Sequence, residues 1–166
     1  VVRERRRLDD PWRDHVWPAV EVLPGLAEMV EWRKLSEDAD GTRWLAAALP
    51  IEMFPKETAG YQMNVTGANP SVFIVLRPNG DGGAEGGIGR EMRAFYATVC
   101  PFEAGNYGQG GDETVDALPM PVEIRAWVED FVARHHVEQP FRKRQRDRLD
   151  PNEVGFGRGA PGGGRK

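Results

Sequence analysis

The sequence has little cysteine and no long apolar stretch. Its one cysteine, Cys100, excludes an internal disulfide and is typical of a protein from a reducing compartment. No apolar run approaches the ~18 residues that a membrane-spanning helix requires. The first ten residues, VVRERRRLDD, lack the hydrophobic centre of a signal peptide. We therefore expect a cytoplasmic protein without a membrane span.

Motifs for phosphate binding are also missing. The glycine-rich stretch at residues 79–89 contains neither a G-x-G-x-x-G spacing nor a G-x-x-x-x-G-K-[ST] motif. The residues after it predict a strand, so there is no helix N-terminus whose dipole would hold phosphate. A flexible hairpin loop is the interpretation that we favour, and we expect no bound cofactor.

The histidines do not predict a metal site. His135 and His136 are adjacent, so on a helix their side chains point about 100° apart and cannot easily share one ion. The only other histidine, His15, is distant in sequence. We favour a histidine pair at a helix C-terminus, with His135 partly packed, and expect no metal.

Length and charge predict one globular domain between two basic ends. A chain of 166 residues with 40% apolar side chains can build one sizeable core. Residues 8–140 carry 10 basic and 22 acidic side chains, a net charge of −12, whereas residues 1–7 contribute +3 and residues 141–166 contribute +5. We expect a flexible basic arm over residues 1–11, a globular domain over residues 12–140, and a tail, first basic and then glycine-rich, over residues 141–166.

The clearest element is a helix bounded by two prolines. Pro121 suits the first turn, where its missing N–H would have no helical partner, and Pro140 indicates that the helix ends by about residue 139. Between them one amphipathic stripe recurs at three- and four-residue spacings: Ile124, Trp127, Val128, Phe131 and His135. We expect this stripe, including Trp127, to be covered by the rest of the domain.

Period-two alternation and β-branched runs predict several strands. The strongest lies at residues 71–77, where both faces are apolar, so we expect it to be central in its sheet. Residues 43–54 predict a long strand with alternate apolar residues on one face; their alanine-rich centre equally suits a helix by propensity, which Pro50 disfavours. Residues 61–70 predict a polar turn or crossing, and residues 101–111 a glycine-interrupted connection that either lacks regular structure or opens with a short helical turn. The other predicted strands cover residues 15–23, 31–37, 91–99 and 114–118.

Sequential strands followed by one helix predict an α+β fold built mainly on an antiparallel sheet. We expect this sheet to be curled or barrel-like, with the C-terminal amphipathic helix closing one open side. The order of elements is that of pleckstrin-homology-like barrels, which is an analogy of fold alone. A parallel sheet is disfavoured because only one segment has a convincing helical period, so the crossover helices are missing.

Two runs of residues carry a resemblance to a known family. The proline-bounded run LPMPVEIRAWVEDFVARHHVEQPFRKRQRDR, residues 118–148, and the run PSVFIVLRP, residues 70–78, resemble small proteobacterial proteins of unknown function. The genes of that family lie beside those of molybdenum-dependent formate dehydrogenases. The resemblance covers roughly residues 12–148, and it implies a context without implying catalytic residues.

Some members of that family are labelled as molybdopterin-guanine dinucleotide biosynthesis protein A, and this sequence does not fit that activity. Nucleotidyltransferases of that type carry a glycine-rich loop with Ser, Arg or Lys after their first strand. Here that place holds Leu-Pro-Gly-Leu at residues 23–26, which cannot do this work. We therefore reject a nucleotidyltransferase function for this chain.

A cluster of basic side chains follows the predicted helix. Its members are Arg142, Lys143, Arg144, Arg146 and Arg148. The cluster is either a solvated extension or a docking site for an acidic partner protein, whose encounter the charge would accelerate. Nucleic-acid binding is disfavoured, because the acidic body repels phosphates and no aromatic side chain is interleaved among the arginines.

Two functions from different classes remain open. The first, which we favour, is a non-catalytic accessory protein that assists assembly, maturation or attachment of a molybdenum-dependent formate dehydrogenase; the resemblance implies as partner a subunit of that enzyme or a small accessory protein encoded with it. The second is a small enzyme or sulfur or cofactor carrier that uses Cys100. The second is disfavoured because Cys100 has no cationic neighbour in sequence to lower its pKa.

Overall fold

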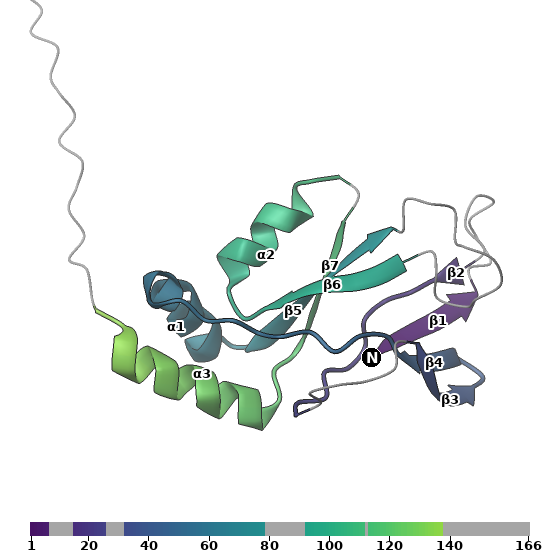
Figure 1. Cartoon of the computed structure of the whole chain (residues 1–166), viewed down its shortest axis with the longest axis horizontal. Helices are drawn as coiled ribbons and strands as arrows, with labels where there is room; N and C mark the ends of the chain where they lie inside the picture. Colours follow the sequence, from purple (N-terminus) through teal and green to yellow (C-terminus); the bar gives the residue numbers. More distant parts are fainter. Residues whose placement is uncertain (7–14, 26–31, 79–91, 112, 138–166) are drawn as a thin grey trace, which may run out of the picture. The chain divides into compact units, whose positions relative to one another are not determined.

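The computed structural model of the chain describes residues 1–6, 15–25, 32–78, 92–111 and 113–137. Val1–His136 forms one compact unit, and in the second unit, Val137–Lys166, only Val137 is described. Within the first unit the described residues form a mixed α and β structure with two small antiparallel sheets and three α-helices (Figure 1). The antiparallel pairing was predicted correctly.

The first sheet, which we call the N-terminal sheet, has the strand order β2-β1-β4-β3. Its strands are β1 (Val2–Arg6), β2 (His15–Val16), β3 (Arg33–Asp38) and β4 (Gly41–Leu45). Gly41, at the hairpin between β3 and β4, has a φ of 124°. A Cβ atom there would lie 2.0 Å from the carbonyl oxygen of Glu4, so only glycine lets β1 approach this hairpin.

The prediction of a flexible arm over residues 1–11 is wrong for its first six residues, which include β1. Val2 is only 2% exposed because its side chain packs in a core cluster, and the backbone of β1 pairs with β2 and β4. Arg3 forms ion pairs with Asp38 and Asp40 of the β3–β4 hairpin. Arg3 therefore has partners distant in sequence, which composition alone does not reveal.

The second sheet, which we call the central sheet, has the strand order β6-β5-β7. Its strands are β5 (Ser71–Pro78), β6 (Met92–Thr98) and β7 (Thr114–Pro119). β5 is the middle strand, as its doubly apolar sequence predicts, and Val72 and Val75 are fully buried. The register of β5 with β6 shifts after Val75, so Phe95 is an extra residue on β6.

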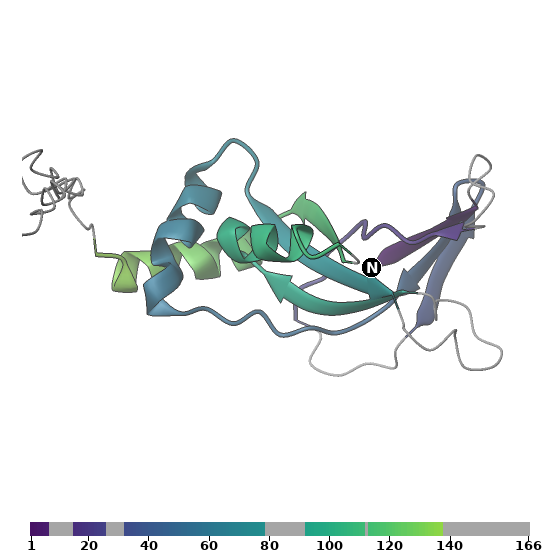
Figure 2. The ribbon, with the colours of Figure 1, turned by 90° about the horizontal axis from the view of Figure 1, so that it is seen from above.

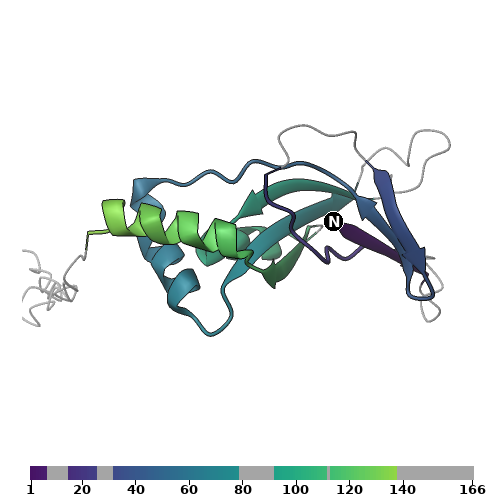
Figure 3. The same ribbon diagram turned by 90° about the horizontal axis from the view of Figure 1, so that it is seen from below.

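The β6 bulge places two consecutive aromatic residues against one helix. Both Phe95 and Tyr96 contact Tyr107 of α2 (Pro101–Gly108), with ring centroids 5.6 and 5.3 Å apart. Figure 2 shows α2 along this face of the central sheet, and Figure 3 shows α3 (Val122–His135) on the other side. α3 begins after Pro121 and ends before Pro140, as predicted.

Three sequence predictions are wrong between residues 15 and 66. Only His15–Val16 forms a strand within residues 15–23. β4 ends at Leu45, and the chain then runs without strand pairing through residue 54 to η1 (Pro55–Glu57). The predicted polar turn at residues 61–70 is mostly α1 (Thr58–Thr66), a helix whose Tyr61 is fully buried.

These changes divide the strands into two separate sheets, so the described residues form no closed barrel and the pleckstrin-homology-like analogy is wrong for them. Their core consists of two clusters. The first cluster lies between the N-terminal sheet and the central sheet and contains Val2, Trp17, Ala19, Trp44, Ala46, Leu76 and Leu118. The second joins α1 and α3 to the central sheet and contains Tyr61, Val65, Val72, Val99, Cys100, Ile124 and Val128.

Candidate functional site

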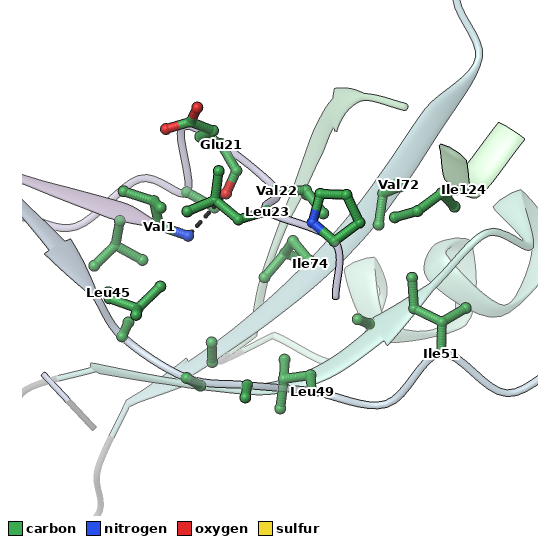
Figure 4. A pocket seen from close by; sticks show the side chains of 18 of the residues that line it. Val1, Glu21, Val22, Leu23, Leu45, Leu49, Ile51, Val72, Ile74 and Ile124 are labelled. Carbon is green, nitrogen blue, oxygen red and sulfur yellow. Dashed lines mark hydrogen bonds between the residues drawn. The ribbon is translucent and has the colours of Figure 1, made fainter. Parts of the chain in front are cut away.

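An apolar cavity of about 280 Å3 lies in the described part of the chain (Figure 4). Its walls come from the start of β1, the segment at residues 19–25, the segment at residues 45–51, both β5 and β6, and the first half of α3. Leu23 and Trp127 line it and are 42% and 44% exposed, so the cavity reaches the surface.

The cavity lies where the two core clusters meet. Its lining includes Val2 and Ala46 from the first cluster and Val72 and Ile124 from the second. Ile74, in the middle of β5, packs against both clusters and also lines the cavity. The space therefore occupies a place that a continuous hydrophobic core would fill.

Small side chains keep this space open. Six alanines are among the lining residues, namely Ala19, Ala46, Ala47, Ala48, Ala94 and Ala97. Protein interiors are normally close-packed, and covering apolar surface contributes about 25 cal/mol per Å2 that is removed from water. A domain of this size is stable by only about 5–15 kcal/mol, so an occupant that fills the space would stabilise the protein substantially.

The cavity offers little to a polar ligand. Glu21 is the only ionisable side chain in its lining, and its carboxylate forms an ion pair with Arg43. The backbone carbonyl of Glu21 accepts a hydrogen bond from the Val1 nitrogen at 2.8 Å, as Figure 4 shows. A ligand with several polar groups would lose its hydrogen bonds to water there, so the chemistry of the lining favours hydrocarbon.

The predicted stripe of α3 divides between the core and this cavity. Ile124 and Val128 are buried, at 9% and 0% exposure, and Phe131 is partly buried. Trp127 was expected to be covered, and this expectation is wrong, because its side chain is 44% exposed at the cavity wall. The stripe is wider than the surface that α1 and the central sheet cover.

The two adjacent histidines both contact protein groups. His135 is exposed, but its ring packs on Phe131 with 4.5 Å between the centroids. The Nδ1 atom of His136 lies 3.1 Å from the Thr58 hydroxyl oxygen, which connects the end of α3 to α1. Within the described ranges no group of three or more His, Cys, Asp or Glu side chains could hold a metal ion.

Cys100 is a core residue. Its side chain is fully buried at the start of α2, and a Cβ atom at Gly60 of α1 would lie 2.7 Å from its sulfur. Burial raises the pKa of the Cys100 thiol, and the Glu103 charge raises it further. A thiol with a raised pKa forms little of the thiolate that nucleophilic or carrier chemistry requires.

Two sequence features lie outside the described residues. They are the glycine-rich stretch at residues 79–89 and the predicted partner-binding residues Arg142, Lys143, Arg144, Arg146 and Arg148. Sequence reasoning missed the cavity, whose clearest signal is the run Ala46-Ala47-Ala48 between two leucines. The predicted alternation put Leu49 and Ile51 on one face, and both line the cavity, but Ala46 and Ala48 from the other face line it too.

The fold and the cavity define a small mixed α and β protein with an apolar cavity that opens to its surface. The chain belongs to the family described as "Protein of unknown function (DUF3305)", which matches residues 1–145. The predicted membership of a family of unknown function is thereby confirmed, and the link to formate dehydrogenase stays a prediction. No curated protein and no solved structure matches the chain. No helix in the described ranges is long and apolar enough to cross a membrane.

Proposed function

We propose that this protein is a non-catalytic, cytoplasmic accessory protein that binds a molybdenum-dependent formate dehydrogenase and assists its assembly, maturation or attachment. The partner is a subunit of the enzyme or a small accessory protein encoded with it. The identity of the partner rests on the resemblance of residues 70–78 and 118–148. The cytoplasmic location rests on the single cysteine.

The half-exposed Trp127 at the wall of the apolar cavity is the observation that carries the binding role. Tryptophan is enriched among the residues that dominate the energy of protein interfaces, because it buries a large apolar area. Here it stands beside a space that is already shaped and apolar. In this proposal α3 also closes the open side of the central sheet, so that one helix both completes the fold and presents Trp127.

The basic residues Arg142, Lys143, Arg144 and Arg146 supply a second, electrostatic contact with an acidic surface of the partner. Charge complementarity of this kind mainly accelerates association, and salt screens it. The jump from a net charge of −12 over residues 8–140 to +5 over residues 141–166 motivates this part of the proposal.

The alternative, a carrier of sulfur or cofactor through Cys100, finds less support. A carrier must expose its thiol to a donor and an acceptor, and Cys100 is fully buried with a raised pKa. Cys100→Ser should therefore leave the supply of active formate dehydrogenase unchanged.

Copurification with formate dehydrogenase from cells that express both proteins is the direct experiment. Wild type should retain a dehydrogenase subunit, and Trp127→Ala should lose most of it. Phe102→Ala is the matched control, since Phe102 is a 54% exposed aromatic residue on α2, across the central sheet from the cavity. Thermal melts of both variants should show folded protein, because a half-exposed Trp costs less than the about 3–5 kcal/mol of a buried one.

Replacing Arg142, Lys143, Arg144 and Arg146 together by Ser should slow association with the partner at low salt and have a smaller effect at physiological salt.

In the copurification experiment, failure of wild type to retain any dehydrogenase subunit would refute the proposed partner. Retention by Trp127→Ala equal to that of wild type would show that the cavity wall is not the contact.

A further inference from the structure

We infer that the cavity binds a large apolar side chain of a protein partner, carried on a segment with Lys or Arg close to that side chain. This inference deepens the proposed function and rests on it for the claim that the occupant belongs to a protein. It adds the chemistry of the segment: one hydrocarbon anchor and neighbouring positive charge.

The apolar anchor follows from the lining and the volume. Apart from Glu21, the lining side chains are aliphatic or belong to Trp127, so these side chains provide mainly apolar contact area. A volume of about 280 Å3 lies just under the ~300–1,000 Å3 of pockets that enclose drug-sized ligands. It suits one or two large side chains that enter from the surface.

The positive charge follows from a carboxylate beside Trp127. Glu21 lines the cavity, and Glu123 lies one helical turn before the lining residue Trp127 on α3. Arg43 neutralises Glu21, whereas Glu123 is exposed and forms no ion pair with another described residue. The Trp127 wall of the cavity therefore carries a negative charge that favours a cationic segment.

α3 combines both kinds of contact. Glu123 and Trp127 are four residues apart, so they are neighbours on the surface of the helix. A Lys or Arg side chain over the Trp127 ring would gain a cation–π contact and lie near the Glu123 carboxylate. The basic side chain nearest in sequence, Arg125, is already paired with Glu129.

The main competing occupant is a free fatty acid, which offers the same hydrocarbon. Its carboxylate would meet the exposed Glu123 carboxylate beside Trp127. Like charges repel, so this occupant should bind less well than a cationic segment of equal apolar size. Decanoate therefore serves as the second arm of the experiment.

The experiment selects peptides from a random dodecapeptide phage library on the immobilised full-length chain. The same library is selected in parallel on a variant whose cavity is filled by Ala94→Leu and Ala97→Leu, each of which adds three carbon atoms to a lining side chain. Peptides enriched on wild type alone should share a large apolar residue with Lys or Arg within a few positions. The most enriched peptide is then synthesised with a fluorescent label.

Affinities from fluorescence polarisation give the quantitative result. The filled variant and Trp127→Ala should each weaken peptide binding by about tenfold or more, as removal of an interface anchor does. Glu123→Gln should weaken it by about twofold to fivefold at low salt and by less at high salt. Ala133→Leu, the same substitution at an exposed position of α3 outside the cavity, should leave it unchanged.

Melting curves show whether each variant is folded. The two leucines fill an apolar space, so the filled variant should melt at or above the wild-type temperature. If the variant with both leucines does not fold, the binding assays on Ala94→Leu alone and on Trp127→Ala test the inference instead. Enrichment of the same peptides on wild type and on the filled variant would overturn the inference, as would acidic consensus sequences or tighter binding of decanoate than of the selected peptide.

The outcomes also separate this inference from the proposed function. The wild type could bind the peptide and the filled variant not, while no dehydrogenase copurifies. This result would support the apolar cavity as a peptide site and would refute formate dehydrogenase as the partner. If the filled variant copurifies with the dehydrogenase as well as wild type does, the accessory role would be supported and the cavity would be refuted as the binding site.

Discussion

Asn64 on α1 is the polar side chain on which the fold should depend most. It is only 7% exposed, and it joins α1 to two strands of the central sheet. Its Nδ2 atom donates to the carbonyl oxygens of Ser71, at 2.7 Å, and of Val99, at 2.8 Å. Its Oδ1 atom accepts from the Ser71 amide at 2.9 Å. One side chain thus holds the start of β5 and the residue after β6.

Asn64→Ala should lower the free energy of unfolding by about 3 kcal/mol. Each of the three hydrogen bonds contributes about 1 kcal/mol, and the Ser71 and Val99 groups left without a partner add a desolvation cost. The better helix propensity of alanine recovers about 0.5 kcal/mol. For a chain of this length the midpoint of thermal unfolding should fall by about 6–12 °C.

Urea unfolding followed by far-ultraviolet circular dichroism measures this loss on the full chain. Asn106→Ala is the control, because Asn106 is exposed on α2 and its replacement should change stability by less than about 0.5 kcal/mol. Asn64→Asp should be at least as harmful as the alanine variant, since a carboxylate oxygen would then face two carbonyl oxygens. A loss below about 1 kcal/mol for Asn64→Ala would refute the reasoning.

Three further perturbations concern packing, the N-terminal strand and titration. Gly60→Ala should lower the free energy of unfolding by about 1–2 kcal/mol, because the new methyl group would lie 2.7 Å from the buried Cys100 sulfur. Gly105→Ala, in open space on α2, should raise it by about 0.5–1 kcal/mol in the same urea experiment. Val2→Ala should cost about 2 kcal/mol, and an unchanged melting temperature would make β1 dispensable. Burial, and then the Glu103 carboxylate, raise the pKa of Tyr96 from 10.0 to about 12, so stability should fall as the pH rises between these values. Ultraviolet absorbance should show the late ionisation, and Glu103→Gln should move it to lower pH.

Elements with strong local patterns were predicted from the sequence. The β-branched run at residues 71–77 identified β5 and its central place, and prolines on both sides bounded α3. α1 was missed because its sequence, TAGYQMNVT, contains glycine, threonine and valine, which are weak helix formers. What stabilises this helix is tertiary, namely the burial of Tyr61 and Val65 and the hydrogen bonds of Asn64.

The cavity could be predicted only in part, because it depends on side chains that are small. The alternation in the segment after β4 placed Leu49 and Ile51 on one face, and both line the cavity, although Ala46 and Ala48 from the other face do so too. That β6 adds Ala94 and Ala97 to the lining depends on how β6 lies relative to the unpaired segment that follows β4. No local pattern encodes that placement, so the run Ala46-Ala47-Ala48 alone could not predict the cavity.

Trp127 illustrates how stability and binding separate on one helix. The stripe predicted on α3 treats Trp127 and Val128 alike, yet Val128 is fully buried and Trp127 is 44% exposed. Val128 and Ile124 join α3 to the second core cluster, so the helix stays in place without Trp127. The area that Trp127 leaves in contact with water borders a cavity that an apolar group can fill. Covering that area on association recovers hydrophobic free energy that folding leaves unused.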